Sequence, residues 1–469
     1  MQELTAGRRM IRETAPAGEG GGMSASSVTA QAARFAVSPA TRFPADVLES
    51  GRLSFFDWFA VALAGAAEPV SRAVRRLVRD EGGAARASAF GLPDKLPARA
   101  AALLNGTVSH ALDYDDTHFA YVGHPSVAVL PAALAVAQQQ NADGKALLEA
   151  FLTGVETTCR VGGWLGRSHY DAGFHQTATA GTFGATAACA RLLGLNANAA
   201  AQALGLAATR ASGLKCQFGT MAKPFHAGMA AANGVEAASL AALGFLARSD
   251  ALECEGGFSA THRGQQDGGP CGNAPPPFLF PQVQYKFHAC CHGTHAALEA
   301  LLALRDEYRL TSDDVASVRL GIHRQWLPVC CIPEPASGLE AKFSLAMTAA
   351  MVLAGIDTAA LDSFTDSVCR DRTLRSVAGR VAIHADATLT DTACHAVIVT
   401  VDGRQFERTI ELGAPLPEQT TRARLQAKAA TLVGPDRANA LWALTESLHT
   451  LPAADLYPQV HALMAGAAS

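Results

Sequence analysis

Small apolar residues at helical spacing dominate the first half of the chain, and they constrain its fold more than any other feature. Between residue 39 and about residue 247, Ala, Leu and Val recur three and four residues apart, with short Gly or Asn-Gly breaks between the runs. Helices with such small side chains pack closely against one another. We therefore expect a large all-helical domain, with helices over 127–139, 145–160, 177–193 and 227–247.

The composition changes between Cys254 and Pro281 to Gly, Pro, Gln and Cys, and three consecutive prolines at 275–277 cannot continue a helix. Beyond this stretch, helical patterns at 295–308 and 343–353 alternate with strand patterns at 315–322 and 393–401. Asp402-Gly403 predicts a two-residue hairpin that leads into 404–412. Two last helical patterns, at 420–433 and 436–449, are expected to return to the first domain.

These patterns predict a mainly α protein with two domains. The large all-helical domain comprises residues 28–270 and 415–469, and a smaller α+β lid domain comprises 271–414. The segment before Val28 carries arginines and a Gly run but no apolar stretch, so it predicts a disordered extension (1–27) rather than a secretory signal.

Charged residues make up 17% of the chain, against about 25% in an average soluble protein, so we expect part of the surface to be buried against another subunit. A net charge of -4 provides no basic field for nucleic acid or for an anionic membrane. The apolar stretches are shorter than the ~20 residues that cross a bilayer. The 11 Cys, with adjacent pairs at 290/291 and 330/331, fit no spaced disulfide framework and indicate reduced thiols in the cytoplasm.

Four segments concentrate His, Lys and Asp beside Gly breaks, and two of them lie in the first half of the chain. In the first, 110–126, Asp113 and Thr117 would share a helix face if the helix continues that far, and His124 precedes a proline. In the second, 173–184, His175 stands just before a helix, where an imidazole can transfer protons near neutral pH. An acidic helix end and a structural histidine are the alternative interpretations.

The third segment, 219–228, places Lys223 before a proline on extended backbone, where it invites an anionic partner or is simply a solvated loop lysine. The fourth, 285–295, places His292 and His295 near two cysteines, but it lacks the further ligand pair that a four-coordinate zinc site needs, so no metal is predicted. We find no convincing phosphate loop, dinucleotide fingerprint or nucleophile elbow.

In their residues and in their order along the chain, these segments resemble the MmgE/PrpD family, whose members include 2-methylcitrate dehydratase, cis-aconitate decarboxylase and iminodisuccinate epimerase. The resemblance runs from about Val28 to the C-terminal helices. It rests on the motifs HALDYDDTH with HPS, GFHQT, GTMAKPFHAG, CCHGTH and EAKFS (340–344). It implies a homodimer with an active site between a helical domain and a lid, and no metal or organic cofactor.

Carried over by motif, the resemblance implies site positions at Asp113, Thr117, His124, His175, Lys223 and His295, and Lys286 is added as a substrate-binding residue. Two positions depart from the decarboxylase. The spacer from Thr117 to His124 is about one residue longer, and Met347 stands where the decarboxylase has a tyrosine. The second departure argues against cis-aconitate decarboxylase proper, because a phenol that could bind or protonate the substrate is missing.

The three reactions of the family share one hard step, formation of a carbanion next to a carboxylate, which needs a positioned base and cations. We assign proton transfers to His124 and His175 and carboxylate binding to Lys223, which can also transfer a proton, and to His295. Asp113 and Thr117 would orient an imidazole or accept a substrate hydroxyl. The prediction is a cytoplasmic, cofactor-independent lyase that dehydrates or decarboxylates a small di- or tricarboxylate such as a 2-methylcitrate-like acid.

Three other functions fit parts of the sequence. An isomerase that epimerises a dicarboxylate such as iminodisuccinate would use the same carbanion. A magnesium-dependent enzyme acting on diphosphates could use Asp113, Asp115 and Asp116 as ligands, but we find no second acidic cluster for a facing helix. A non-catalytic helical scaffold would not need His and Lys concentrated in Gly-flanked turns.

Overall fold

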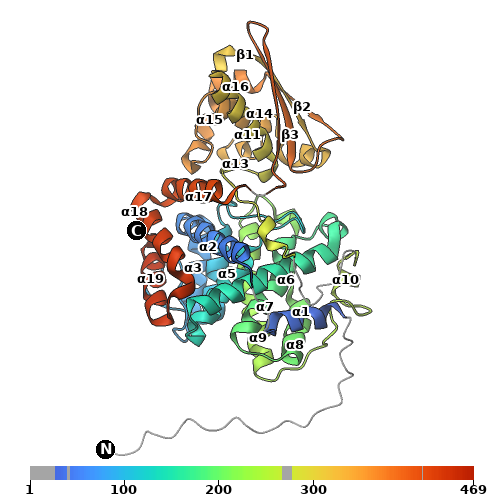
Figure 1. Cartoon of the computed structure of the whole chain (residues 1–469), viewed down its shortest axis with the longest axis vertical. Coiled ribbons are helices and arrows are strands. Elements are labelled where there is room, and N and C mark those ends of the chain that lie inside the picture. The colour runs from blue at the N-terminus through green and yellow to red at the C-terminus, as the bar shows by residue number, and fades with distance from the viewer. Residues whose placement is uncertain (1–26, 40–42, 267–276, 415, 469) are drawn as a thin grey trace, which may run out of the picture.

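The computed structural model of the chain describes residues 27–39, 43–266, 277–414 and 416–468. It consists of a large helical body and a smaller α+β part that stands on one end of the body (Figure 1). The predicted fold class, mainly α with a smaller α+β domain, is confirmed. The expected extension 1–27 lies, apart from Ser27, outside the described residues.

Helices from both ends of the chain build the helical body. Its N-terminal helices pack mainly on one another, with α4, α5, α6, α7 and α9 at the centre. The bounds are α1 (Val28–Val37), α2 (Ala45–Gly65), α3 (Pro69–Glu81), α4 (Ala98–His110), α5 (Ser126–Gln140), α6 (Gly144–Asp171), α7 (Gln176–Leu192), α8 (Ala197–Arg210), α9 (Ala222–Ala242), α10 (Phe258–Thr261), α17 (Glu418–Val433), α18 (Pro435–Ser447) and α19 (Ala453–Ala465).

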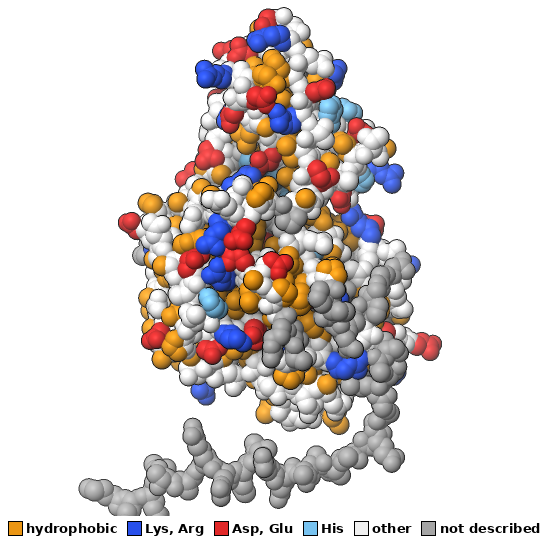
Figure 2. Space-filling model, viewed as in Figure 1, with side chains coloured by type: hydrophobic (Ala, Val, Ile, Leu, Met, Phe, Trp, Pro, Cys, Tyr) orange, Lys and Arg blue, Asp and Glu red, His pale blue; other side chains and the backbone are white. Residues whose placement is uncertain are grey.

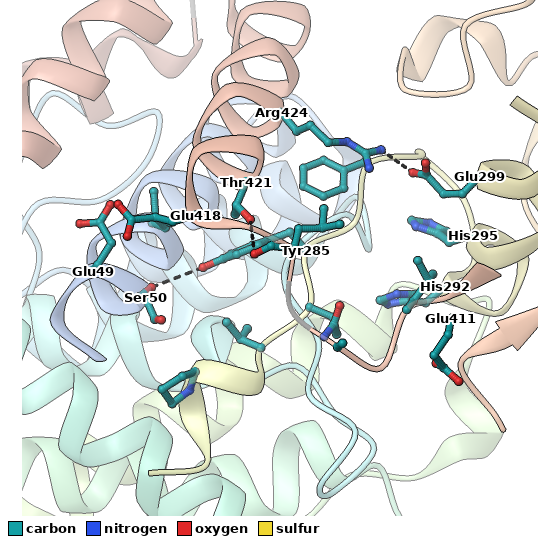
Figure 3. A pocket seen from close by; sticks show the side chains of 18 of the residues that line it. Glu49, Ser50, Tyr285, His292, His295, Glu299, Glu411, Glu418, Thr421 and Arg424 are labelled. Carbon is teal, nitrogen blue, oxygen red and sulfur yellow. Dashed lines mark hydrogen bonds and ion pairs between the residues drawn. The ribbon is translucent and has the colours of Figure 1, made fainter. Parts of the chain in front are cut away.

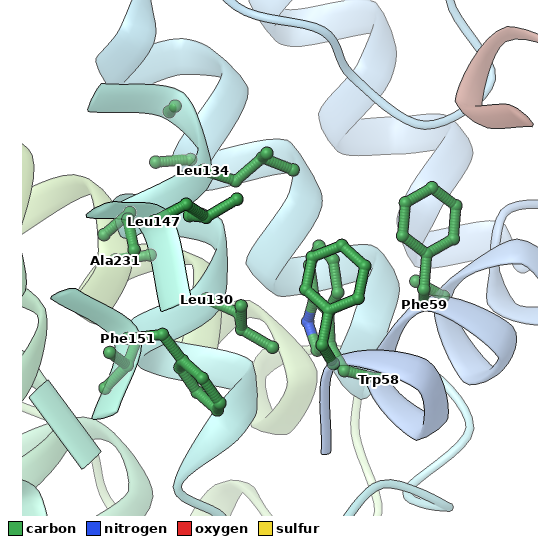
Figure 4. Packing of buried hydrophobic residues seen from close by; sticks show 14 of the residues in the cluster. Trp58, Phe59, Leu130, Leu134, Leu147, Phe151 and Ala231 are labelled. Carbon is green, nitrogen blue, oxygen red and sulfur yellow. The ribbon is translucent and has the colours of Figure 1, made fainter. Parts of the chain in front are cut away.

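Small residues let the central helices approach closely, as the sequence predicts. Where α4 crosses α9, a Cβ added to Gly106 would lie 2.8 Å from the Cα of Gly228, so a larger residue would force the two helices apart. Larger side chains fill the space between α2, α5 and α6, where Trp58, Leu130 and Phe151 are almost completely buried (Figure 4). The low charge content of the chain therefore reflects a dense helical core.

The C-terminal helices α17 and α18 pack against α2. One buried ion pair joins them to it: Lys428 Nζ lies 2.6 Å from Asp57 Oδ1, and the two side chains are 3% and 2% exposed. The same ammonium group donates a hydrogen bond to the carbonyl oxygen of Tyr114 at 2.7 Å. Lys428 thus connects the end of the chain to α2 and to the loop that follows α4.

The α+β part, which we call the lid, is a four-stranded sheet in the order β2-β1-β3-β4, with β1 and β2 parallel and the other pairs antiparallel. Helices α11 and α14 pack against the sheet. The bounds are α11 (His292–Tyr308), β1 (Val315–Ile322), α12 (Leu327–Cys330), α13 (Gly338–Ala341), α14 (Leu345–Leu353), α15 (Asp366–Arg370), α16 (Arg372–Ala378), β2 (Val381–Ala385), β3 (Ala393–Thr400) and β4 (Gln405–Glu411).

The strands expected at 315–322 and 393–401 are confirmed. The hairpin loop is one residue longer than expected, because the Thr400 N–H donates to the Arg404 carbonyl and leaves three residues between them. Gly403 takes the positive φ of 85° that this turn requires. Strand β2 was not predicted, since it has only five residues and all of them are half-exposed or exposed.

Charged side chains of both signs are intermixed on the face shown in Figure 2, and this face shows no continuous basic field. Within the described residues, no single helix has the length and apolar character to span a membrane. One pair, α2 with α3, bent by 89°, passes that test of length and composition.

The buried ion pair gives a first prediction. Lys428→Met should lower the free energy of unfolding by about 3–5 kcal/mol, because it leaves the Asp57 carboxylate buried without a cation. Urea unfolding followed by circular dichroism measures the loss. Lys145→Met is the matched control, because Lys145 is 67% exposed in its pair with Glu149 and should cost at most ~1 kcal/mol. Equal losses in the two variants would contradict the structural role of the pair.

Candidate active site between the helical body and the lid

The chain passes from the helical body to the lid through one extended stretch, residues 283–291, which we call the crossing segment. Leu279 and Phe280, just before it, donate their N–H groups to the buried carboxylate of Glu156. Gln284 then pairs with Thr117, each donating its N–H to the other's carbonyl oxygen at 2.8 Å. The crossing segment is thereby fixed against the loop between α4 and α5.

Asp113 is the meeting point of three parts of the structure. Its carboxylate lies 2.6 Å from the ammonium nitrogen of Lys223, on α9, and 3.1 Å from that of Lys286, on the crossing segment. Lys286 also donates to the Asp113 carbonyl oxygen at 2.6 Å. Burial alone would raise the pKa of Asp113, but the two lysines hold it well below its usual value. Asp113 is therefore ionised.

Two expectations about this region are wrong. Helix α4 ends at His110 and Asp113 has a left-handed φ of 52°, so Asp113 and Thr117 do not share a helix face. Lys223 does not lie on extended backbone; it is the second residue of α9, because a proline in the first turn needs no hydrogen-bond partner for its nitrogen. The left-handed turn at Asp113 is what directs the carboxylate toward α9.

Asp115 orients two imidazoles. His110 Nδ1 lies 2.9 Å from one of its carboxylate oxygens, and His124 Nδ1 lies 2.7 Å from the other. An ionised carboxylate only accepts hydrogen bonds, so His110 Nδ1 carries the proton and His110 Nε2 is the atom without one. His124 lies between two carboxylates, because its Nε2 is 3.4 Å from Asp113 Oδ1. Burial lowers the pKa of His124 to about 4, although Asp115 opposes the shift.

A cavity of about 310 Å³ opens beside these groups, and we call it the lysine cavity. His110 reaches its wall, and His110 Nε2 is buried without a hydrogen-bond partner. Helix α9 and the loops before it form one side, and the lid forms the other. Its polar and sulfur-bearing wall consists of His110, Asp113, Thr220, Met221, Lys223, Cys290, Cys291 and Lys342, with Glu68 at its edge.

His175 lies behind His110 and does not line the cavity. It caps the N-terminus of α7, as expected, and its ring stacks 6.0 Å from that of His110. Its Nδ1 lies 3.1 Å from Nδ1 of His226. Burial, reinforced by Lys223 and His110, lowers its pKa well below the usual value, so His175 is a neutral imidazole one layer away from the cavity.

Thr117 and His295 belong to a different neighbourhood, around a second cavity of about 290 Å³ between α2, α11 and α17 (Figure 3). The Thr117 hydroxyl lies 2.8 Å from His292 Nδ1, and the ring of His292 lies 4.7 Å from that of His295. Burial lowers the pKa of both histidines well below the usual value. The structure thus brings Asp113, His124, Lys223 and Lys286 together, whereas His295 lies apart from them.

The two departures from the decarboxylase pattern have little effect on the lysine cavity. A bridge between His118 and Gly123 closes the longer spacer, and His124 still lies 3.4 Å from Asp113 Oδ1. Met347 is 2% exposed within the hydrophobic core of the lid and lines neither cavity. The sequence argument drawn from a missing phenol at this position therefore receives no support from the structure.

Three residues that line the cavity and one that contacts its histidines were not selected from the sequence: His110, Cys291 and Lys342 line it, and Asp115 contacts His110 and His124. Three of the four lie inside the segments that concentrate His, Lys and Asp, and Lys342 lies in the motif EAKFS, which carries part of the family resemblance. The sequence could not choose between neighbours, because the choice depends on where α4 ends and how the lid loops fold back. Lys342 is such a case, since its carbonyl oxygen accepts the N–H of Cys291 from across the lid.

His110, Asp113, Asp115 and His124 each offer one metal-ligand atom, and these atoms lie within 4.8 Å of one another. The two ammonium groups on Asp113 oppose a further cation there. We therefore expect the purified protein to carry no stoichiometric divalent metal, and its activity to survive a chelator. Elemental analysis and assays with and without a chelator test this. A stoichiometric metal, or activity that a chelator abolishes and a metal restores, would contradict it.

Comparison with known proteins identifies both parts of the chain. Residues 30–269 match the MmgE/PrpD N-terminal domain and residues 288–449 match the MmgE/PrpD C-terminal domain. A cis-aconitate decarboxylase-like protein, oryM, of Aspergillus oryzae is 30% identical over 301 residues, which cover 59% of this chain and 61% of that protein. The human cis-aconitate decarboxylase is 37% identical over 177 residues, 36% of this chain and 37% of that protein.

A cis-aconitate decarboxylase of Aspergillus terreus matches over a longer stretch. It is 28% identical over 451 residues, which cover 87% of this chain and 90% of that protein. The matched stretches of the A. oryzae and human proteins, in contrast, span less than two thirds of those proteins' own length.

Proposed function

The chain belongs to the MmgE/PrpD family, and we propose that it is a lyase that dehydrates or decarboxylates a small di- or tricarboxylate through a carbanion next to a carboxylate. One observation carries the proposal. Lys223 and Lys286 meet at Asp113 beside a cavity that His110 also lines, and the buried Nε2 of His110 has no hydrogen-bond partner. Cations and an imidazole thus lie close together at one small cavity.

The ammonium groups supply the carboxylate-binding part of this site. Lys223 and Lys342 line the lysine cavity, and Lys286 lies behind Asp113. Lys223 and Lys286 contact the carboxylate of Asp113, whereas Lys342 has no ion pair among the described residues, which leaves its positive charge for an anionic ligand. Negative charge that develops next to a carboxylate in the transition state is stabilised by the same cations.

The imidazoles supply the proton-transfer part. Asp115 accepts a hydrogen bond from His110 Nδ1, so that Nε2 is the basic atom of His110. His110 is among the residues that line the cavity, and the ring of His175 stacks against that of His110. We propose His110 and His124 as the acid and base, with His175 as a positioning residue. A good acid or base group contributes about 10²–10⁴ in rate.

The isomerase alternative remains open, because an epimerase needs the same base and cations. The relatives named as cis-aconitate decarboxylases favour a lyase. The cytoplasmic location and the homodimer expected from the sequence also remain predictions.

Incubation of the full-length protein with a panel of di- and tricarboxylates in deuterated water, followed by proton NMR, tests the proposal. The panel includes cis-aconitate, a 2-methylcitrate-like hydroxy acid and iminodisuccinate. We expect loss of water or of carbon dioxide from one of the first two. Deuterium exchange into a dicarboxylate that loses neither water nor carbon dioxide would establish the isomerase instead. No reaction with any member of the panel would count against both.

Replacement of the proposed groups should separate their roles. His110→Ala should lower kcat by about 10²–10⁴ at unchanged fold, because among the described residues His110 is the histidine that lines the cavity. Lys342→Met should mainly raise KM, since Lys342 has no ion pair in the described part of the chain and is free to bind substrate. Steady-state kinetics and thermal unfolding measure both effects. A well-folded His110→Ala variant with full turnover would overturn the assignment.

The pH dependence should follow the lowered pKa of His124. A base with a pKa of about 4 stays neutral through mildly acidic solution, so kcat/KM should be flat from about pH 5.5 to 8. An ordinary histidine would instead cause a decline below about pH 6.5. The unfolded chain binds this proton more readily than the folded one, so stability falls as the pH falls, and each rate needs a parallel folding measurement. A decline near pH 6.5 in folded protein would contradict a base with this pKa.

A further inference from the structure

The lid side of the lysine cavity carries a thiol that the proposed reaction does not use. Cys291 lies at the N-terminus of the 17-residue helix α11 and lines the cavity. Its neighbour Cys290 is 4% exposed, and its sulfur lies 3.0 Å from the hydroxyl of Thr294. Burial raises the pKa of Cys290 to about 12, so only one thiol of this adjacent pair is suited to react.

The loops around Cys291 hold it in place and affect its acidity. The Cys291 N–H donates to the carbonyl oxygen of Lys342 at 2.9 Å, which fixes the residue between two lid loops. The Cys330 thiol lowers the pKa of Cys291, burial opposes this shift, and the positive charge of Lys286 adds to the lowering.

Two lysines indicate that this part of the cavity accepts an anion. Lys342 lines the cavity and has no ion pair among the described residues. Lys223 lines it too, beside Asp113. A ligand carboxylate would satisfy the ammonium group of Lys342.

We propose that Cys291 is a covalent modification site for small electrophiles that carry a carboxylate. The lysines of the cavity bind the carboxylate and hold the electrophilic carbon near the sulfur. With a haloacetate, the sulfur forms a bond to the methylene carbon, the halide leaves and the thiol proton passes to solvent. With an α,β-unsaturated acid, the sulfur bonds to the β-carbon and the α-carbon takes up a proton, with no leaving group. The product of a dehydration is an α,β-unsaturated acid, and only this extension to a reaction product rests on the proposed function.

Competition between iodoacetate and iodoacetamide tests the proposal on the full-length protein. These reagents share one reactive carbon but differ in charge. Peptide mass spectrometry gives the labelling rate of each cysteine, and Cys216, which is exposed and adjacent to Lys215, is the internal control. We expect the ratio of iodoacetate to iodoacetamide rates to be about tenfold higher at Cys291 than at Cys216, the effect of about 1.4 kcal/mol of charge attraction.

A variant and a competitor identify the origin of the preference. Lys342→Met should reduce the ratio at Cys291 several-fold and leave Cys216 unchanged, whereas the remote exposed variant Lys145→Met should change neither. Citrate should protect Cys291 alone. Equal ratios at the two cysteines in wild-type protein, or labelling of Cys290 in place of Cys291, would overturn the proposal. Neither result depends on turnover, so the proposal can fail while the proposed lyase activity stands.

Discussion

The carboxylate of Asp113, held between two ammonium groups, is the interaction on which the site depends. It joins the loop after α4, the first turn of α9 and the crossing segment that leads into the lid. Two of these segments belong to the helical body and the third leads out of it, and buried apolar contacts alone would not fix their relative positions to within hydrogen-bond distance. The ion cluster therefore sets the geometry of the lysine cavity and of the crossing segment together.

Burial has opposite consequences for the acidic and the basic groups of this centre. It would favour neutral carboxyl groups, but the lysines and histidines around Asp113 and Asp115 keep both pKa values low. It favours neutral imidazoles, and for His124 and His175 no neighbour reverses this effect. The result is a set of fixed charges with neutral bases between them, an arrangement that suits proton abstraction next to a carboxylate.

Much of the fold could be predicted from the sequence, because periodicity and small-residue content report local structure directly. Strand β1 and helices α5 and α7 follow their patterns within one residue or two. The sequence indicated which segments form the candidate site, but not which residues within them come together. The left-handed turn at Asp113, the helical position of Lys223 and the folding of the lid loops onto Cys291 depend on contacts between distant segments. A sequence pattern therefore identified the motifs, and the choice of His295 over the nearer His110 shows the limit of that approach.

The single carboxylate shared by His110 and His124 has a consequence for how protons move through the site. Asp115 can compensate one positive charge, so a proton taken up by either imidazole weakens the affinity of the other for a second proton. A positive charge on His110 lowers the pKa of His124, whose ring lies 4.6 Å away. In the proposed reaction, only one of the two imidazoles would then be positively charged at a time.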